Sequence, residues 1–258
     1  MPELIEVESY RRALYLTVGR RIDAASTPDL SFVRGVDPVE LVATLTGAVV
    51  ESTSRRGKLA MAHLDNGTVL GLRFGMTGRL VVDDVAPIEQ LEYSSGRDDP
   101  SWDRFALRFA GGGTLRINDP RRFGNVELDP DLTRLGPDAT TISVAELREA
   151  MRSDRSLKAV LLDQSRIAGL GNLLVDEILW RVGLDPARSA RSLPDETLAE
   201  LRRVMRRTIA QLTRRGGSHL GDLADERHVD GRCPRDGAQL LRRTLAGRTT
   251  LSCPEHQR

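Results

Sequence analysis

The first residues of the chain combine a secondary amine with a neighbouring carboxylate. The sequence begins Met1-Pro2-Glu3, and removal of the initiator methionine, which a small second residue usually permits, would leave Pro2 as the amino terminus. An α-amino group has an unperturbed pKa of about 7.7–8.0, so a useful fraction is a free nucleophile near neutral pH. Its attack on an aldehyde-level carbon would give an iminium ion, the Schiff-base chemistry of a catalytic lysine moved to the chain terminus. Glu3 would move protons beside it; the alternative is an ordinary helix start with proline at N1.

The C-terminal end of the chain carries two similar turns with metal-binding side chains. Cys233-Pro-Arg-Asp236 is followed, after sixteen residues, by Cys253-Pro-Glu-His256. Zinc accepts cysteine, histidine and carboxylate ligands in a tetrahedron, so the pattern predicts a zinc ribbon held by the two cysteines, Asp236 and His256. The alternative is a pair of buried thiols, with Asp236 as a turn residue.

Two further stretches have the composition of nucleic-acid contacts. Gly169-Leu-Gly-Asn172 would place backbone N–H groups at a helix N-terminus, which suits a phosphate, although such a motif is also a common packing turn. Asp119-Pro-Arg-Arg-Phe-Gly124 puts cations and one aromatic ring on a turn. Arginine and an apolar wedge are what proteins insert where a base has left the stack; the alternative is a turn with a half-buried Phe123.

The charge distribution is more informative than the net charge, which is +1 over 258 residues. Residues 83–103 contain seven acids against Arg97, a net charge of −6. Residues 199–216 have a net charge of +5 and residues 232–258 a net charge of +4. This segregation favours a polyanionic partner for the C-terminal half, with a solvated arginine face as the alternative.

Composition indicates an ordinary soluble globular protein with one large domain or two smaller ones, since 40% of the residues are hydrophobic and 29% charged. No stretch approaches the ~18 apolar residues of a membrane span, and the N-terminus lacks the pattern of a secretory signal. Two cysteines make no disulfide framework. We therefore expect a cytoplasmic protein with no membrane association.

The elements that must position these residues change character halfway along the chain. Apolar residues at helical spacing predict a helix over residues 3–18. Two hairpins are expected, each with a glycine-containing turn between strand-like runs. Their strands are residues 59–64 with 68–74 and residues 105–109 with 114–117. The acidic stretch 83–103 between the hairpins is expected to be a solvated loop.

The second half is predicted to be helical after a Pro-, Asp- and Gly-rich break at residues 129–141. Ser143 and Glu146 have the spacing of a capping box for a helix over residues 144–151. Further helices are expected at residues 157–162, 173–182 and 194–215. The last of these has an apolar face opposite its arginines, and short strands are expected near the C-terminus.

Together these motifs resemble those of the formamidopyrimidine-DNA glycosylase/endonuclease VIII family over essentially the whole chain. They fall in the family's order: Met1-Pro-Glu-Leu-x-Glu-Val-Glu8, Arg56-Gly-Lys58, Gly75-Met-x-Gly78, Asp119-Pro-Arg-Arg-Phe-Gly124, Leu162-Asp-Gln164, Ala168-Gly-Leu-Gly-Asn172, Asp176-Glu177, Gly216-Gly-Ser218, and Gly247-Arg-x-Thr250 before Cys253-x-x-His256-Gln257. The resemblance implies an α+β fold with DNA bound in a cleft. Its domains would be a catalytic β-sandwich with a leading helix (1–130), a helix–two-turns–helix DNA-binding domain (131–225) and a zinc ribbon (226–258).

The resemblance also implies roles for individual residues. Pro2 would attack the sugar C1′, and Glu3 would protonate the sugar as its ring opens. The remaining roles follow the family: Glu6 and Glu177 support that site, Lys58 binds the backbone near the lesion, Met76, Arg121 and Phe123 fill the gap left by the flipped nucleotide, and Asn172, Arg248 and Lys158 grip phosphates.

The implied activity is that of a bifunctional DNA glycosylase and AP lyase of base excision repair, acting on oxidised or abasic DNA by β- and then δ-elimination. Structural zinc would be its only cofactor, damaged DNA its partner, and a monomer its state. One departure from the family is that residues 218–233, which include the loop over the flipped base, are shorter than in enzymes for oxidised guanine. Three alternatives remain open: a damage- or abasic-site-binding protein with weak or no excision, a glycosylase for bulky or cross-linked bases, and a non-catalytic zinc-ribbon DNA-binding protein.

Overall fold

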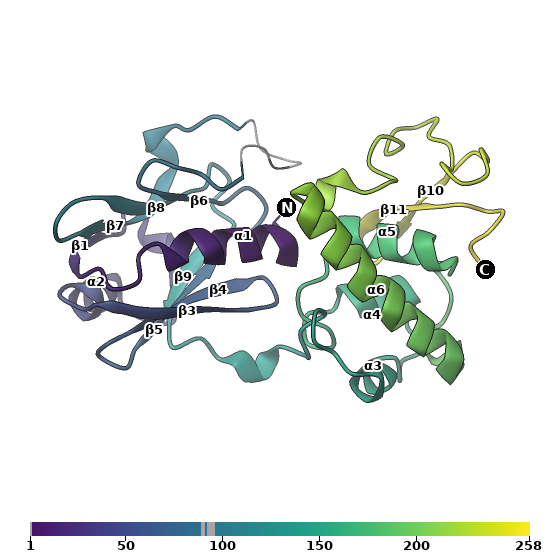
Figure 1. The fold of residues 1–258 in the computed structure, drawn as a ribbon, viewed down its shortest axis with the longest axis horizontal. Helices are drawn as coiled ribbons and strands as arrows, with labels where there is room; N and C mark the ends of the chain where they lie inside the picture. The colour runs from purple at the N-terminus through teal and green to yellow at the C-terminus, as the bar shows by residue number, and fades with distance from the viewer. Residues whose placement is uncertain (1, 89–90, 92–95) are drawn as a thin grey trace. The chain divides into compact units, whose positions relative to one another are not determined.

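The computed structural model describes residues 2–88, 91 and 96–258 (Figure 1). Met1, whose removal is predicted, lies outside the described residues. Residues 92–95, at the centre of the acidic stretch, lie outside them as well. The chain divides into two compact units, Met1–Leu132 (unit 1) and Thr133–Arg258 (unit 2). A further division near residue 225 stays a prediction.

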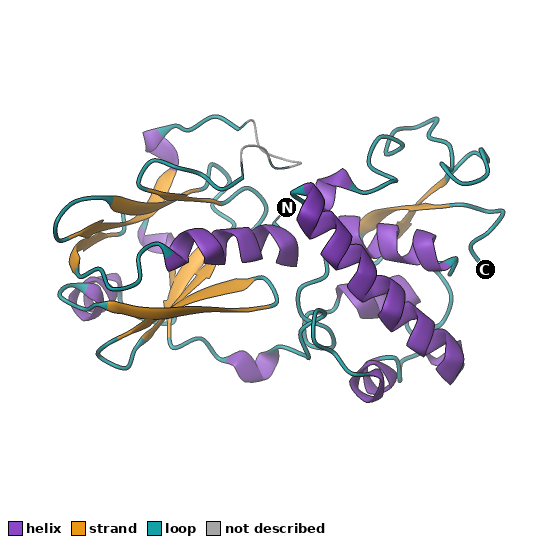
Figure 2. Cartoon of the chain, viewed as in Figure 1, coloured by secondary structure: helices purple, strands orange, loops and turns teal. Residues whose placement is uncertain are grey.

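Unit 1 is built from two sheets with a helix between them. The first sheet has the order β1 (Ile22–Ser26), β7 (Asp103–Phe109), β8 (Thr114–Asn118) and β6 (Arg79–Val82), and the second the order β2 (Val33–Arg34), β9 (Asn125–Leu128), β5 (Val69–Arg73), β4 (Leu59–Leu64) and β3 (Val50–Arg56). Neighbouring strands are antiparallel except for the parallel pair β2 and β9. Both predicted hairpins are confirmed as β4–β5 and β7–β8. Helix α1 (Leu4–Tyr15) contacts β3 and β4 of one sheet and β6 of the other (Figure 2).

The apolar face of α1 fixes how this helix is seated. Val7, Tyr10 and Leu14 are buried in the core that both sheets share, and burying a large apolar side chain stabilises by about 1.5–3 kcal/mol. The Tyr10 ring lies 4.5 Å from the Phe74 ring, and its hydroxyl donates to the Gly78 carbonyl at 3.3 Å. The helix is therefore held along its length, which fixes the position of its N-terminus.

Unit 1 also contains elements that the sequence reading did not predict. Helix α2 (Pro38–Leu45) is capped by the Asp37 carboxylate and has proline at its start, a recognisable signal. The first half also holds β1, β2 and β9, which were not predicted individually. The prediction of a wholly solvated loop at 83–103 is wrong where Ile88 and Leu91 are buried in the core.

Unit 2 is mainly helical, as predicted. Its elements are α3 (Val144–Ala150), α4 (Leu157–Leu162), α5 (Asn172–Val182), α6 (Asp195–Arg215) and the hairpin β10 (Leu241–Leu245)–β11 (Arg248–Ser252). Short 3-10 turns occur in both units of the chain, at Leu30–Phe32, Pro100–Trp102, Leu132–Arg134, Ala190–Ser192 and Ser218–Leu220. The capping box at Ser143 is confirmed, and α6 ends at Gly216, whose φ of +108° is left-handed.

Helix α5 is the centre of unit 2, since it contacts α6, α4 and β11. The predicted apolar face of α6 is buried against it, through residues such as Leu201, Met205 and Leu212. Among the described helices, none combines the length and apolar character that crossing a membrane requires.

Candidate functional site

The N-terminal turn of unit 1 holds its two glutamates in one arrangement. The Glu6 carboxylate accepts the Glu3 backbone N–H at 2.8 Å, and the Glu3 carboxylate accepts the Glu6 N–H, so the two form a capping box at the start of α1. Both side chains are buried, as is Pro2. The capping box therefore fixes the Glu3 carboxylate at the start of α1, and Glu3 directly follows Pro2 in the chain.

Lys58 lies at the same end of unit 1 as this turn. Arg11 donates to the Thr53 hydroxyl at 3.2 Å, and the Glu8 carboxylate lies 3.4 Å from Arg55, so α1 runs antiparallel to β3. A helix rises about 1.5 Å and a strand about 3.3 Å per residue. The helix segment from Glu8 back to Glu3 is therefore about as long as the strand segment from Arg55 forward to Lys58. Both segments end at the same end of unit 1, where the Lys58 side chain is half-buried.

Asp119 organises the turn with the predicted wedge residues. Its fully buried carboxylate accepts the backbone N–H groups of Arg121, Phe123 and Gly124 at 3.2, 3.0 and 2.8 Å. It also accepts the Thr77 hydroxyl at 2.6 Å. One carboxylate thus sets the shape of residues 119–124 and ties this turn to the turn at residues 75–78; we call these two segments the wedge turns.

The wedge turns present their side chains outward. Phe123 is 54% exposed, the Arg121 guanidinium lies 4.9 Å from its ring centroid, and Met76 is half-buried. A Cβ on Gly75 would lie 2.4 Å from the Phe123 backbone, so the two turns are in backbone contact. The structure therefore brings these three predicted residues together, and Phe123 is not the half-buried ring of the alternative interpretation.

In unit 2, the side chains of Asn172 and Lys158 meet at the carbonyl of Thr249, the residue after Arg248. The Asn172 amide nitrogen donates to this oxygen at 3.0 Å, and the Lys158 ammonium donates to it at 3.2 Å. The neighbouring Arg248 is exposed. The N-terminus of α5, helix α4 and the β10–β11 hairpin are therefore joined at one oxygen atom.

Lys158 does not match a direct phosphate contact. Its side chain is 0% exposed and its ammonium lies 2.6 Å from the equally buried carboxylate of Asp176. Arg227 contacts the other oxygen of that carboxylate at 3.0 Å. Burial excludes the lysine from solvent, so in this structure it holds α5 and the hairpin together instead of facing a ligand.

Glu177 orders the start of the short segment 218–233. Its carboxylate accepts the backbone N–H groups of Asp222 and Leu223 at 3.0 and 3.1 Å and the Arg181 side chain at 2.6 Å. A Cβ on Gly221 would lie 2.6 Å from this carboxylate, so a larger residue there would require the Glu177 side chain to move. The segment is anchored to α5 at this point, and the expected support of Pro2 by Glu177 stays a prediction.

The two Cys-Pro turns converge as predicted. One ligand atom from each of Cys233, Asp236, Cys253 and His256 lies within 4.8 Å of the others. Two thiols, an imidazole and a carboxylate are a donor set that suits zinc. The His256 Nε2 lies 3.2 Å from the Trp180 carbonyl oxygen, and Nδ1 lies 2.7 Å from the Asp236 carboxylate. Nε2 is thus held by the backbone, and Nδ1 is the ring nitrogen that faces the cluster and would bind a metal there.

The environment of the cluster shifts the pKa of the Cys253 thiol and that of the Asp236 carboxyl in opposite directions. Burial raises the pKa of the Cys253 thiol to about 11. The hydrogen bond with His256, with help from the Ala238 N–H, holds the pKa of the Asp236 carboxyl well below its usual range. Without metal, the carboxylate is therefore ionised and the thiol protonated near neutral pH, so metal binding must displace a proton from sulfur.

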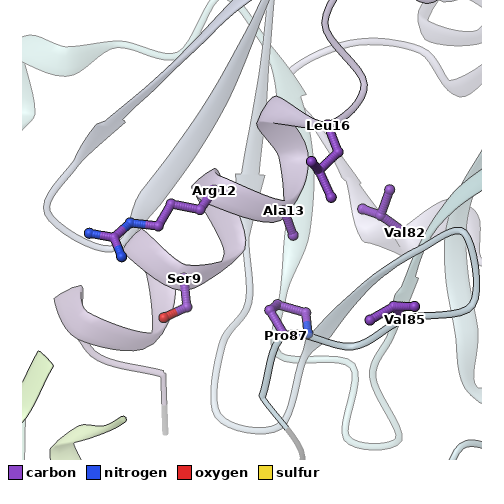
Figure 3. Close-up of a pocket in the computed structure, with 7 residues that line it drawn as sticks. All are labelled: Ser9, Arg12, Ala13, Leu16, Val82, Val85 and Pro87. Atoms are coloured by element: carbon purple, nitrogen blue, oxygen red, sulfur yellow. The ribbon is translucent and has the colours of Figure 1, made fainter. Parts of the chain in front are cut away.

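A cavity of about 370 Å³ opens beside α1, lined by Ser9, Arg12, Ala13, Leu16, Val82, Val85 and Pro87 (Figure 3). Its walls are mostly apolar, and none of these lining residues belongs to the predicted site. It lies along the later turns of α1, away from Pro2 and Glu3.

Sequence reasoning missed the residues that position the others. Asp119 lay inside a quoted motif but was given no role. Residues 173–182 are apolar except for Asp176, Glu177 and Arg181, and Asp176 stands inside this apolar run. An acid on the buried face of a helix requires a buried partner, and the structure identifies Lys158 as that partner.

Comparisons with known proteins give one family. Residues 1–126 match the model for the formamidopyrimidine-DNA glycosylase N-terminal domain, and residues 135–222 match that for the formamidopyrimidine-DNA glycosylase H2TH domain. The chain is 34% identical over 294 residues to the formamidopyrimidine-DNA glycosylase of Rhodopseudomonas palustris. It is 35% identical over 285 residues to that of Geobacillus kaustophilus, and in both cases all of each chain is covered.

Solved structures of the Lactococcus lactis protein are similar throughout. Its complex with abasic-site DNA matches with a TM-score of 0.82 and 28% identity over 99% of each chain. Its complex with a Fapy-dG-containing DNA matches with a TM-score of 0.83 and 28% identity over 99% of this chain and 100% of that one.

Proposed function

This chain belongs to the formamidopyrimidine-DNA glycosylase family, and on that basis we propose that it is a bifunctional DNA glycosylase and AP lyase of base excision repair. The observation that carries the proposal is the capping box that fixes Glu3, the residue directly after Pro2, at the start of α1. Once Met1 is removed, the Pro2 amine would be the nucleophile and the adjacent Glu3 the proton donor, the pair that covalent catalysis requires.

In the proposed first step, the Pro2 nitrogen forms a bond to C1′ while the bond from C1′ to the damaged base breaks. The Pro2 nitrogen gives up its N–H proton as the new bond forms, and the base leaves with the bonding electrons and takes up one proton. Glu3 protonates O4′ as the C1′–O4′ bond opens, and the nitrogen lone pair then forms the iminium. Glu6 holds the Glu3 backbone at 2.8 Å and so keeps the donor in place.

In the proposed second step, the iminium acts as an electron sink for strand cleavage. Loss of a C2′ proton releases the 3′ phosphate by β-elimination, and loss of a C4′ proton releases the 5′ phosphate by δ-elimination. Water then hydrolyses the Schiff base and restores the Pro2 amine. These proton transfers need no metal or redox cofactor.

The proposed DNA contacts come from both units. Lys58 would bind the backbone near the lesion and the exposed Phe123, with Arg121 and Met76, would replace the extruded nucleotide, since exposed apolar groups beside cations suit an unstacked duplex. Asn172 and Arg248 would bind phosphates, with Lys158 as a positioning residue behind them. Glu177 would hold the short segment 218–233 near the extruded base.

Zinc is the proposed occupant of the Cys233, Asp236, Cys253 and His256 cluster. When bound there, it would supply a structural crosslink and no chemistry. Its place beside Trp180 would fix the ribbon to the C-terminal end of α5.

Borohydride trapping tests the proposal. Borohydride reduces an iminium to a stable amine, so incubation with abasic-site DNA should crosslink the processed protein to DNA through Pro2. Glu3→Gln should reduce base excision far more than cleavage at a preformed abasic site, because the abasic aldehyde is already open. A peptide map that places the crosslink on Lys58 would exclude Pro2 as the nucleophile.

An N-terminal extension provides the matched control. It blocks the Pro2 amine but leaves the phosphate contacts, so it should abolish trapping while binding to abasic DNA persists. Absence of trapping by the untagged, processed protein would favour the binding-only alternative. A panel of duplexes with oxidised, bulky and cross-linked bases would then separate the two glycosylase alternatives.

A further inference from the structure

A second cavity of about 370 Å³ lies within unit 2, and the proposed function does not use it. It is lined by Arg203, Val204, Arg207 and Thr208 on α6, and by groups that include Trp180 and Arg235. The cavity therefore joins a basic helix to the candidate metal ribbon. We call it the α6 groove.

The arginines of the α6 groove are unevenly paired. Arg203 is bonded to Glu200 at 2.7 Å, and Arg235 lies 4.9 Å from the Trp180 ring centroid. Arg207 is exposed, and no ion pair joins it to any residue within the described ranges. Like charges four residues apart on a helix repel each other, so Arg203 and Arg207 together favour an added anion.

An unsatisfied hydroxyl is the second, independent observation. Thr208 is 0% exposed, and its hydroxyl has no hydrogen-bond partner among the described residues. A threonine within a helix ordinarily bonds to a carbonyl one turn back, and leaving a buried donor unpaired is unfavourable. The same residue lines the groove, and because its hydroxyl oxygen is itself buried, an acceptor entering there would satisfy it once the Thr208 side chain turns toward the groove.

The α6 groove is separate from the proposed phosphate site. Arg181 also lines it and stands near the end of α5, whereas Asn172 begins that helix. The two positions are about 13 Å apart along the helix axis at the standard rise per residue. A phosphate held by Asn172 therefore does not reach the groove.

We propose that the α6 groove binds an acidic peptide segment of a partner protein, with a carboxylate between Arg203, Arg207 and the Thr208 hydroxyl. Arginine matches a carboxylate with two parallel hydrogen bonds. Val204, one helical turn before Thr208, gives an apolar wall for a neighbouring apolar side chain. The protein would thus recruit or be recruited by a partner while its DNA contacts remain free.

A peptide fits these features better than duplex DNA does. The groove has the volume of a small-ligand site, which admits a side chain but not a duplex. Glu200 and Asp222 also line it, and their carboxylates would repel evenly spaced phosphates. A flexible peptide places its charges where the arginines are and its apolar groups elsewhere.

Fluorescence anisotropy with the full chain tests the proposal. The probe is a labelled peptide of alternating aspartate and leucine at physiological salt, and its asparagine–leucine counterpart is the neutral control. Arg207→Glu should weaken binding of the acidic peptide about tenfold or more. Thr208→Val, which keeps the shape and removes the hydroxyl, should weaken it about fivefold.

Arg206→Glu is the matched control, because it makes the same charge change at the neighbouring exposed position of α6, which does not line the groove. It should change the peptide affinity less than about twofold. Equal losses for Arg206→Glu and Arg207→Glu, or equal binding of the neutral peptide, would overturn the proposal, as would no binding of the acidic peptide.

Binding of a DNA duplex without lesions tests whether the groove is instead a nucleic-acid site. If Arg207→Glu weakens binding of this duplex and leaves the peptide unaffected, the groove is a nucleic-acid site and the peptide proposal is wrong. Borohydride trapping should be unchanged in Arg207→Glu. Its loss in every variant would count against the proposed function alone, because the peptide measurement does not depend on Pro2.

Discussion

Each unit positions its proposed DNA-contacting residues with a fully buried aspartate, but the two aspartates bind different kinds of partner. In unit 1, Asp119 accepts three backbone N–H groups and a hydroxyl, all of them neutral. In unit 2, Asp176 lies between the cations of Lys158 and Arg227. A carboxylate bound by backbone N–H groups dictates the path of one chain segment. A carboxylate bound by cations instead joins elements that are distant in the sequence.

The difference follows from what each unit must position. The wedge turns are short segments next to a rigid sheet, so fixing their backbone is sufficient. Asn172 and Arg248 stand on a helix and a hairpin separated by more than seventy residues, and these meet through the Lys158 contact with Thr249. The stability of unit 2 should therefore depend more strongly on buried charged side chains and on metal than the stability of unit 1 does.

Removal of metal should give the largest difference between the units. Structural zinc contributes about 10–16 kcal/mol in isolated finger peptides, so chelation should abolish amide protection in the β10–β11 hairpin while β4 and β5 keep theirs. Hydrogen exchange with and without chelator measures this, and Cys253→Ser should reproduce it. Equal loss of protection in both units would contradict the comparison.

The affinity for zinc should also increase with pH. Burial raises the pKa of the Cys253 thiol to about 11, so the apo protein carries a proton on that sulfur, which zinc must displace. Each displaced proton makes the affinity about tenfold higher per pH unit. Competition with a chromophoric chelator on either side of neutrality measures the slope, and a flat profile would exclude the thiol as a ligand.

Asp176→Ala should destabilise unit 2 by about 3–5 kcal/mol, because it leaves Lys158 and Arg227 without their counter-ion. The double variant Asp176→Leu with Lys158→Met should recover much of that loss, since apolar replacement of a buried pair is often neutral. Denaturant unfolding followed at Trp180 reports on unit 2. A single variant as stable as the double would show that the buried pair contributes little.

Asp119→Asn should have a smaller effect, confined to unit 1. The amide cannot accept all four donors, and each unsatisfied buried donor costs about 1–3 kcal/mol. We expect weaker binding of lesion duplexes, whose gap the wedge must fill, and little change with single-stranded abasic DNA. Equal losses on both substrates would argue against the wedge.

Asn172→Ala should give the smallest effect, a weaker affinity for abasic DNA. Asparagine carries no charge, so loss of its phosphate contact should cost about one hydrogen bond, roughly 0.5–1.5 kcal/mol, and leave the slope of log affinity against log salt unchanged. Because Thr249 keeps its bond from Lys158, stability should hardly change. An unchanged affinity for abasic DNA would remove Asn172 from the interface.

The sequence predicted best where local rules decide the outcome. Ser143 with Glu146 gave a capping box, and the turn at Asp65–Gly67 gave the β4–β5 hairpin, because both depend on neighbouring residues. The cluster of candidate metal ligands was predicted because each turn places its own pair, although their convergence depends on the hairpin between them.

Long-range pairing set the limit of the sequence analysis. Lys158 was assigned to phosphate from the family resemblance, and only the fold brings Asp176 to 2.6 Å from it. Ile88 and Leu91 were placed in a solvated loop because acids surround them, yet they enter the core. In these cases the deciding partner lies many residues away, where spacing carries no information.

The contact between Gly75 and the Phe123 backbone has a consequence for how this protein can diversify. The two wedge turns touch through main-chain atoms, with no room for a side chain at Gly75, while Met76 and Phe123 extend from them. The mutual spacing of the turns is thus independent of which side chains they display. Substitutions at Met76 and Phe123 can accordingly change what the two turns present without compensating changes in the sandwich, whereas any side chain at Gly75 would have to be accommodated by both turns at once.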